Sequence, residues 1–158
     1  MLQHGDTAPD FSLPDQDGRI ITLSELLIDS RLILFFYPAD FTPICTREAC
    51  AFQDATSELA ASGIAVAGIS PNDSESHARF RDRHNLSYTL LCDPQRQAIK
   101  AYGVDGPLGI GVRRATFVID RDQRIQATVC ADIRLAPHRE LMQQAMFATE
   151  VSPDPAAR

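Results

Sequence analysis

The sequence predicts an α/β fold with a mixed central sheet, flanking helices and an N-terminal β-hairpin extension. Two continuous apolar runs, at 32–37 and 64–69, are typical of buried parallel strands. Segments with a helical pattern alternate with such runs, and this alternation favours a sheet covered by helices on both faces. Two further strand-like runs near the C-terminus flank a short turn, which adds antiparallel strands to the sheet.

The first half of the chain supplies a hairpin and a strand–helix–strand unit. "FSLPDQDGRIITL" (11–23) reads as a hairpin that turns at Asp17-Gly18. "LILFFY" (32–37) has no polar residue before its last position, as expected for a central parallel strand. A helix follows over 43–61 and is closed by Gly63, since glycine is favoured just after a helix end. The run at 64–69 is the second buried strand.

The second half adds three helices and three strands. These are a charged helix at 74–84, a strand at 88–92, a helix at 94–102, a hairpin formed by "RATFVID" and "RIQATVC", and a last helix from Pro137 to about Ala148. The resulting order, βαβ followed later by ββα, is the thioredoxin arrangement with extra elements at the front and in the middle.

Length and charge limit the class of protein. The 158 residues suit one domain, expected over 1–150, with a Pro/Ala-rich segment at 151–158 that we expect to be a flexible tail. The net charge of −6 argues against nucleic acid or an anionic membrane as a partner. The apolar run "LILFF" is too short to span a bilayer, and the first residues lack the pattern of a secretory signal. We therefore expect a cytoplasmic protein.

Cys45 lies in the stretch "TPICTREAC" (42–50), at a position suited to reactivity. We expect Thr42 to cap the helix and Pro43 to take its first position, which puts Cys45 third in the helix. Unpaired N–H groups and the helix dipole stabilise an anion there, so the reactive thiolate form is favoured. The alternative is that Cys45 is a small core residue, because cysteine is often buried.

Cys50 stands five residues further on, about 140° around the helix from Cys45 at ~100° per residue. Cys45 belongs to an apolar stripe with Ala49, Phe52, Leu59 and Ala60. Cys50 instead shares a largely polar face, which favours a redox role over a structural one.

The remaining cysteines and the histidines indicate no further site. Cys92 and Cys130 each end a strand-like run without a nearby partner, so we interpret both as core residues. The four histidines are scattered without the spacing of a zinc site, and no metal is expected. "GPLGIGV" (106–112) lacks the full glycine pattern of a dinucleotide-binding loop and leads into a strand.

"YPADFTPICTREAC" resembles the P-x-x-x-T-x-x-C active-site motif of the peroxiredoxins. The second cysteine five residues later is similar to the bacterioferritin-comigratory (Q-type) branch. "GDTAPDFSLPDQDG", "LLCDP" and "RRATFVIDRD" extend the resemblance over most of the chain. The chain departs from the branch at Ile44, where glycine is usual, at Cys92, where serine is common, and in the short glycine-rich loop before Arg114.

The resemblance implies a role for each motif residue. Cys45 corresponds to the peroxidatic cysteine and Cys50 to the resolving cysteine, while Pro38 and Thr42 correspond to residues that line the pocket. The family's arginine directly precedes the small-Ser/Thr-Phe stretch of a strand, which matches Arg114 and not Arg113. Judged without the resemblance, Arg114 is equally well a salt-bridge residue or a cap on the sheet edge.

These roles imply a thioredoxin-dependent peroxidase of the atypical 2-Cys type. Its substrates would be hydrogen peroxide and organic hydroperoxides, its recycling partner a thioredoxin-like reductant, and it would need no cofactor. We expect a monomer or a weak homodimer. Two alternatives stay open: a thiol–disulfide oxidoreductase on the same fold, which would normally carry C-x-x-C, and a non-catalytic redox sensor that uses the same thiolate.

Overall fold

The structure is a computed structural model, and it describes residues 1–148. The predicted tail at 151–158 lies outside the described residues. Two strands, β1 (Ser12–Pro14) and β2 (Ile20–Thr22), form the predicted N-terminal hairpin, with Ser12 opposite Thr22. A short helix, α1 (Leu23–Leu26), follows directly.

A five-stranded mixed sheet forms the centre of the molecule, in the order β5-β4-β3-β6-β7. Its strands are β3 (Arg31–Phe36), β4 (Ile64–Ser70), β5 (Thr89–Cys92), β6 (Ala115–Ile119) and β7 (Ile125–Cys130). β3 is parallel to β4 and antiparallel to β6, and β7 is antiparallel to β6. The predicted central strand and C-terminal hairpin are therefore confirmed.

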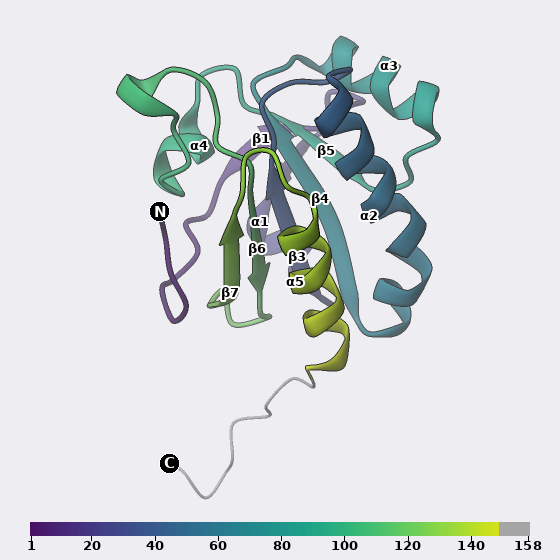
Figure 1. Cartoon of the computed structure of the whole chain (residues 1–158), viewed down its shortest axis with the longest axis vertical. Coiled ribbons are helices and arrows are strands. Elements are labelled where there is room, and N and C mark those ends of the chain that lie inside the picture. The colour runs from purple at the N-terminus through teal and green to yellow at the C-terminus, as the bar shows by residue number, and fades with distance from the viewer. Residues whose placement is uncertain (149–158) are drawn as a thin grey trace, which may run out of the picture.

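Helices cover both faces of the sheet (Figure 1). One face carries α2 (Pro43–Ala61), α3 (Ser74–His84) and α5 (Ala136–Phe147). The other carries the β1–β2 hairpin, α1 and α4 (Gln97–Ala101). A 3₁₀ turn, η1 (Pro107–Gly109), lies in the loop before β6. The predicted helices at 43–61 and 74–84, and the last helix that starts beside Pro137, are confirmed.

The predicted helix at 94–102 is shorter than expected. It begins only at Gln97, because Arg96 adopts a left-handed conformation with φ of 62°. The carboxylate of Asp93 accepts hydrogen bonds from the backbone N–H groups of Gln97 and Ile99. These bonds stabilise a first turn that begins at Gln97. The sequence pattern predicted that residues 94–96 are helical, whereas in the structure they precede the helix.

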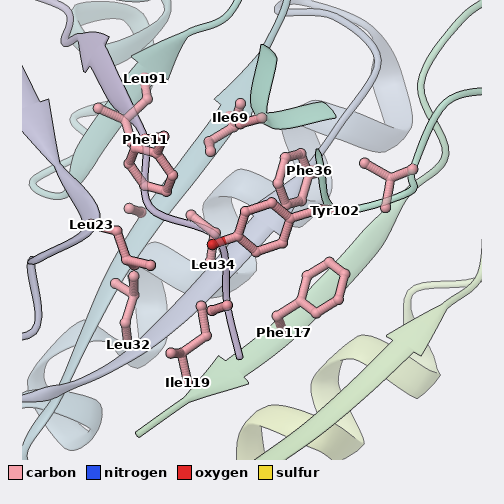
Figure 2. Close-up of a cluster of buried hydrophobic side chains, with 14 of the residues drawn as sticks. Phe11, Leu23, Leu32, Leu34, Phe36, Ile69, Leu91, Tyr102, Phe117 and Ile119 are labelled. Carbon is pink, nitrogen blue, oxygen red and sulfur yellow. The ribbon is translucent and has the colours of Figure 1, made fainter. Parts of the chain in front are cut away.

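Alternate residues of β3 divide the core into two clusters. Leu32, Leu34 and Phe36 face the side of α1 and α4, where the ring of Tyr102 lies between Phe36 and Phe117, as Figure 2 shows. Ile33 and Phe35, together with Tyr37 just after the strand, face α2, α3 and α5. Because β3 is fully buried on both faces, the loop that follows it starts from a fixed position.

Within residues 1–148, no helix combines the length and the apolar character needed to cross a membrane.

Candidate active site

Cys45 is the third residue of α2 and is 2% exposed. β3 ends at Phe36, a loop spans 37–42, and Pro43 opens the helix, so the predicted position of the cysteine is confirmed. N–H groups in the first turn of a helix have no partner within the helix. The Cys45 sulfur therefore lies where the helix itself stabilises negative charge.

The pairing of β3 with β6 brings Arg114 close to Cys45. Phe36 at the end of β3 lies opposite Ala115 at the start of β6, so the residue before β6 lies at the end of the sheet that leads into α2. The Nη2 of Arg114 donates to the Sγ of Cys45 at 3.1 Å. Arg113 points elsewhere and binds the Asp132 carboxylate at the surface.

Three further hydrogen bonds hold the Arg114 side chain and backbone. Nη1 donates to the Oε1 of Glu48 at 2.7 Å, Nε donates to the backbone carbonyl of Asp132 at 3.1 Å, and the backbone N–H donates to the Asp132 carboxylate at 3.0 Å. Burial disfavours the charge of Arg114, but Glu48 and Cys45 together raise its pKa above the ordinary value. The guanidinium is thus a fixed cation beside the Cys45 sulfur.

Glu48 is a buried acid that the sequence patterns did not single out. Burial raises its pKa from 4.5 to about 7, and the charge of Arg114 opposes this shift only in part. Its Oε1 binds Arg114, while its Oε2 has no hydrogen-bond partner among the described residues. The spacing of three residues between Cys45 and Glu48 is a signal that both share one helix face. The sequence pattern placed Ala60, and not Glu48, in the buried stripe of this helix. Ala60 is exposed, so that part of the prediction was wrong.

His138 of α5 lies behind Glu48, with its Nδ1 3.8 Å from the Glu48 Oε2. Its Nδ1 is 2.8 Å from the hydroxyl of Thr116, and its Nε2 is 2.9 Å from the backbone carbonyl of Ala131. Burial lowers the pKa of His138 below its ordinary value. The His138 ring is therefore neutral. Its Nε2 carries the hydrogen that the Ala131 carbonyl accepts, and its Nδ1 can accept from the Thr116 hydroxyl.

Thr42 is the N-cap residue of α2, but its side chain does not cap the helix as predicted. The hydroxyl donates instead to the backbone carbonyl of Ala39 at 3.0 Å. This bond closes the loop before the helix and directs the hydroxyl away from the helical N–H groups. Thr42 is exposed, so its hydroxyl lies at the surface near the first turn.

Pro38 is exposed and lines an open groove of about 610 Å³. The other lining residues come from the loop before β6 and the turn after β7, and they are Asp105, Gly106, Pro107, Ile110, Gly111, Val112, Arg113 and Asp132. Asp132 joins this groove to the site because it also binds Arg114. Pro38 is therefore placed at the edge of the site.

Cys50 is half-buried on α2 and makes no disulfide with Cys45 in this structure. Burial and the nearby charge of Asp54 raise the pKa of the Cys50 thiol. Both cysteines lie on one continuous helix, so Cys50 is not brought into the group formed by Cys45, Glu48 and Arg114.

The other two cysteines differ in burial. Cys92 is 2% exposed and contacts the hydroxyl of Ser74, as expected of a core residue. Cys130 is only half-buried at the end of β7, where it packs against the edge of the core. The prediction that it is a core residue is therefore only partly correct. Among residues 1–148, no group of three or more His, Cys, Asp or Glu side chains is arranged to hold a metal ion.

Known proteins resemble this chain over most of its length. The model of the AhpC/TSA family matches residues 4–128. A Mycobacterium tuberculosis protein provisionally classed as a peroxiredoxin is 42% identical over 130 residues, 78% of this chain and 82% of its own. Peroxiredoxin Bcp of Escherichia coli K12 is 37% identical over 147 residues, 89% of this chain and 93% of its own. The crystal structure of peroxidoxin BcpB from Mycobacterium tuberculosis superimposes with a TM-score of 0.87 at 37% identity, covering 93% and 97% of the two chains.

Proposed function

Because the chain belongs to the AhpC/TSA family and is a peroxiredoxin of the bacterioferritin-comigratory branch, we propose that it reduces hydroperoxides through a sulfenic acid at Cys45. The observation that carries this assignment is the 3.1 Å contact between the Arg114 guanidinium and the Cys45 sulfur. A fixed cation beside a sulfur at a helix N-terminus favours the thiolate, which is the nucleophilic form.

In the first step, the thiolate of Cys45 attacks one oxygen of the hydroperoxide. A sulfur–oxygen bond forms, the oxygen–oxygen bond breaks, and the leaving oxygen takes a proton to become water or an alcohol. Sulfur is oxidised to sulfenic acid while the peroxide is reduced. Arg114 and the N–H groups of Ile44 and Cys45 stabilise the charge that develops on the leaving oxygen, without any need to reorganise.

Thr42 and Pro38 have supporting roles in this proposal. The hydroxyl of Thr42 lies at the helix N-cap, and it can turn from the Ala39 carbonyl to a bound peroxide. Pro38 has no N–H group to hydrate, and it forms part of the groove wall at the edge of the site. Both residues would limit how water and substrate approach the sulfur.

In the second step, the Cys50 thiolate attacks the sulfur of the sulfenic acid. A disulfide forms, hydroxide leaves, and with one proton it becomes water. In an intact helix, Cα atoms five residues apart are roughly 8.6 Å apart by the rise and radius of an α-helix. A disulfide tolerates at most about 6.8 Å. The step therefore requires residues 43–51 of α2 to unwind, although they are helical in the reduced structure.

In the third step, a thioredoxin-like dithiol reduces the disulfide by exchange and is itself oxidised to a disulfide. Unwinding of α2 would present the bond between Cys45 and Cys50 to this partner. No cofactor takes part in any of the three steps. We further propose that the protein acts in the cytoplasm as a monomer or weak homodimer, which agrees with its acidic composition and with the absence of a membrane-spanning helix within residues 1–148.

The assignment is tested by peroxide consumption coupled to thioredoxin, thioredoxin reductase and NADPH. Wild-type protein is expected to turn over, whereas Cys45→Ser is expected to be inactive, because a serine hydroxyl is scarcely ionised near neutral pH. Cys92→Ser is the matched control, since it changes a buried cysteine away from the site. Turnover by Cys45→Ser near the wild-type rate would exclude Cys45 as the nucleophile. Single oxidation of Cys45 without turnover would favour the redox sensor.

A further inference from the structure

A buried polar cluster outside the active site holds the loop that leads into α2. We call it the Asp40 cluster, and it consists of Tyr37, Asp40, Asn72, Ser76 and His77. Asp40 is at its centre and is 7% exposed. Its Oδ1 accepts from the Tyr37 hydroxyl at 2.7 Å, and its Oδ2 accepts from the Ser76 hydroxyl at 2.8 Å. Its backbone N–H donates to the Asn72 side chain at 3.0 Å.

His77 joins this loop to two other elements. Its Nδ1 lies 2.6 Å from the Asp40 Oδ2, and both side chains are 0% exposed. Its Nε2 lies 2.9 Å from the backbone carbonyl of Leu91 in β5. A carbonyl only accepts, so Nε2 carries a hydrogen, and a second proton lies between Nδ1 and the carboxylate. Asp40 is therefore fixed to α3 and, through the ring, to β5.

The cluster ends where the reactive segment begins. Asp40 precedes Cys45 by five residues, and the residue after it, Phe41, has a left-handed backbone with φ of 65° and is 49% exposed. The ring of Phe41 packs edge-on against Phe80 of α3, with ring centroids 5.3 Å apart. Upstream of Phe41 the chain is held by buried hydrogen bonds, whereas Phe41, Thr42 and Pro43 are exposed.

We propose that the Asp40–His77 pair is a latch that favours the wound form of the first turns of α2. His77 is then a positioning residue, which acts through Asp40 on the place of the Cys45 sulfur beside Arg114. This inference rests on the proposed function, in which peroxide reacts with the wound helix and disulfide formation needs the unwound helix. A contact that stabilises one of two conformations shifts their populations by its own free energy.

A latch of this kind predicts opposite effects on two successive steps. Weakening it should slow sulfenic acid formation, because the wound form becomes less populated. The same change should speed disulfide formation, because the unwound form becomes more populated. The sulfenic acid then has less time to react with a second peroxide, so over-oxidation should fall. Substitution of a residue that only stabilises the fold is not expected to change the rates of sulfenic acid formation and disulfide formation in opposite directions.

Two substitutions of His77 separate its two hydrogen bonds. His77→Gln places its amide nitrogen near the former Nε2, so it keeps a donor for Leu91 but loses the bond to Asp40. His77→Asn places its amide nitrogen near the former Nδ1, so it keeps a donor for Asp40. Tyr102→Phe is the matched control. It removes one partly buried hydrogen bond, to the backbone of Pro9, on the opposite face of the sheet. Tyr102 belongs to the cluster drawn in Figure 2.

Sulfenic acid formation and disulfide formation are followed in single-turnover stopped-flow experiments, and over-oxidation is measured by mass spectrometry at a fixed excess of peroxide. For His77→Gln we expect the first rate to fall and the second to rise, so that the ratio of the second rate to the first increases about tenfold, the usual scale for a buried charged hydrogen bond. His77→Asn should lie close to wild type. Tyr102→Phe should lower the melting temperature and leave both rates within about twofold.

Changes of both rates in the same direction, or no change in His77→Gln, would overturn the latch. If His77→Gln does not fold, Tyr37→Phe removes only the hydroxyl bond to Asp40 and should show the same opposed changes at a smaller size. Equal rates in Tyr37→Phe and wild type would then overturn the latch instead. Failure of the proposed function looks different, because wild-type Cys45 would form no sulfenic acid at all.

Discussion

The Nη2 of Arg114 lies 3.1 Å from the Sγ of Cys45, although 69 residues separate the two in the chain. The pairing of β3 with β6 produces this contact, because it places the start of β6 beside the loop that leads into α2. The same guanidinium also binds Glu48, so a single cation lies between a sulfur and a carboxylate. The reactivity of Cys45 is expected to depend on how this cation is shared.

Substitution of Arg114 tests its part in the first step. Arg114→Ala should slow sulfenic acid formation by at least about 100-fold, because it removes a fixed donor beside the reacting atoms. Arg114→Lys is the matched control. It keeps a positive charge but cannot bind Cys45 and Glu48 together in one plane, so an intermediate rate is expected. An unchanged rate in Arg114→Ala, measured in a single turnover on folded protein, would assign Arg114 a structural role only.

Glu48 should make the stability of the reduced protein depend on pH. Burial raises its pKa from 4.5 to about 7, so between these values the folded protein holds a proton that the unfolded chain releases. The free energy of unfolding therefore falls as the pH rises through this window, by about 3 kcal/mol at most, and this contribution is constant above it.

Urea unfolding at about pH 5 and pH 8 measures this effect. Glu48→Gln carries no titratable group at this position, so its free energy of unfolding should fall less than that of wild type over the same interval. The difference between the two proteins isolates Glu48 from the other carboxylates. Parallel pH profiles for wild type and Glu48→Gln would mean that Glu48 is charged throughout.

Cys50→Ser should separate oxidation from recycling. The variant should still react once with peroxide, but it should turn over poorly with thioredoxin, because no thiol is available to form the intramolecular disulfide. Its sulfenic acid should persist and oxidise further, giving species heavier by about 16 and about 32 Da in mass spectra. Full thioredoxin-linked turnover in this variant would point to Cys92, Cys130 or a second subunit as the resolving thiol.

Local signals explain why much of the fold was predictable from sequence. The buried strand at 32–37, the proline at the start of α2 and the glycine after its end each act over a few residues, and each prediction was confirmed. The position of Cys45 in the helix followed directly. By contrast, the start of α4 depends on the Asp93 side chain and the left-handed Arg96, which hydrophobic periodicity does not report.

The surroundings of Cys45 were less predictable, because they depend on tertiary contacts. Glu48 is an ionisable residue, and its burial is stabilised by the hydrogen bond from Arg114, which lies 66 residues away in the chain. Thr42 occupies the predicted N-cap, but the loop geometry gives its hydroxyl the Ala39 carbonyl as partner. The bonds among Asp40, His77 and Leu91 likewise join three separate segments. Arg114 itself was identified through resemblance to a family and not through any local pattern.

The proposed reaction cycle requires the start of α2 to unwind before Cys45 and Cys50 can form a disulfide. Amide hydrogen exchange, compared between the reduced protein and the peroxide-oxidised protein, tests it most directly, with the 45–50 bond verified by peptide mapping. Residues 44–50 should be protected in the reduced form, where α2 is continuous from Pro43 to Ala61, and should lose that protection in the disulfide form. Equal protection of these residues in both forms, with the bond in place, would show that the disulfide forms without unwinding of α2.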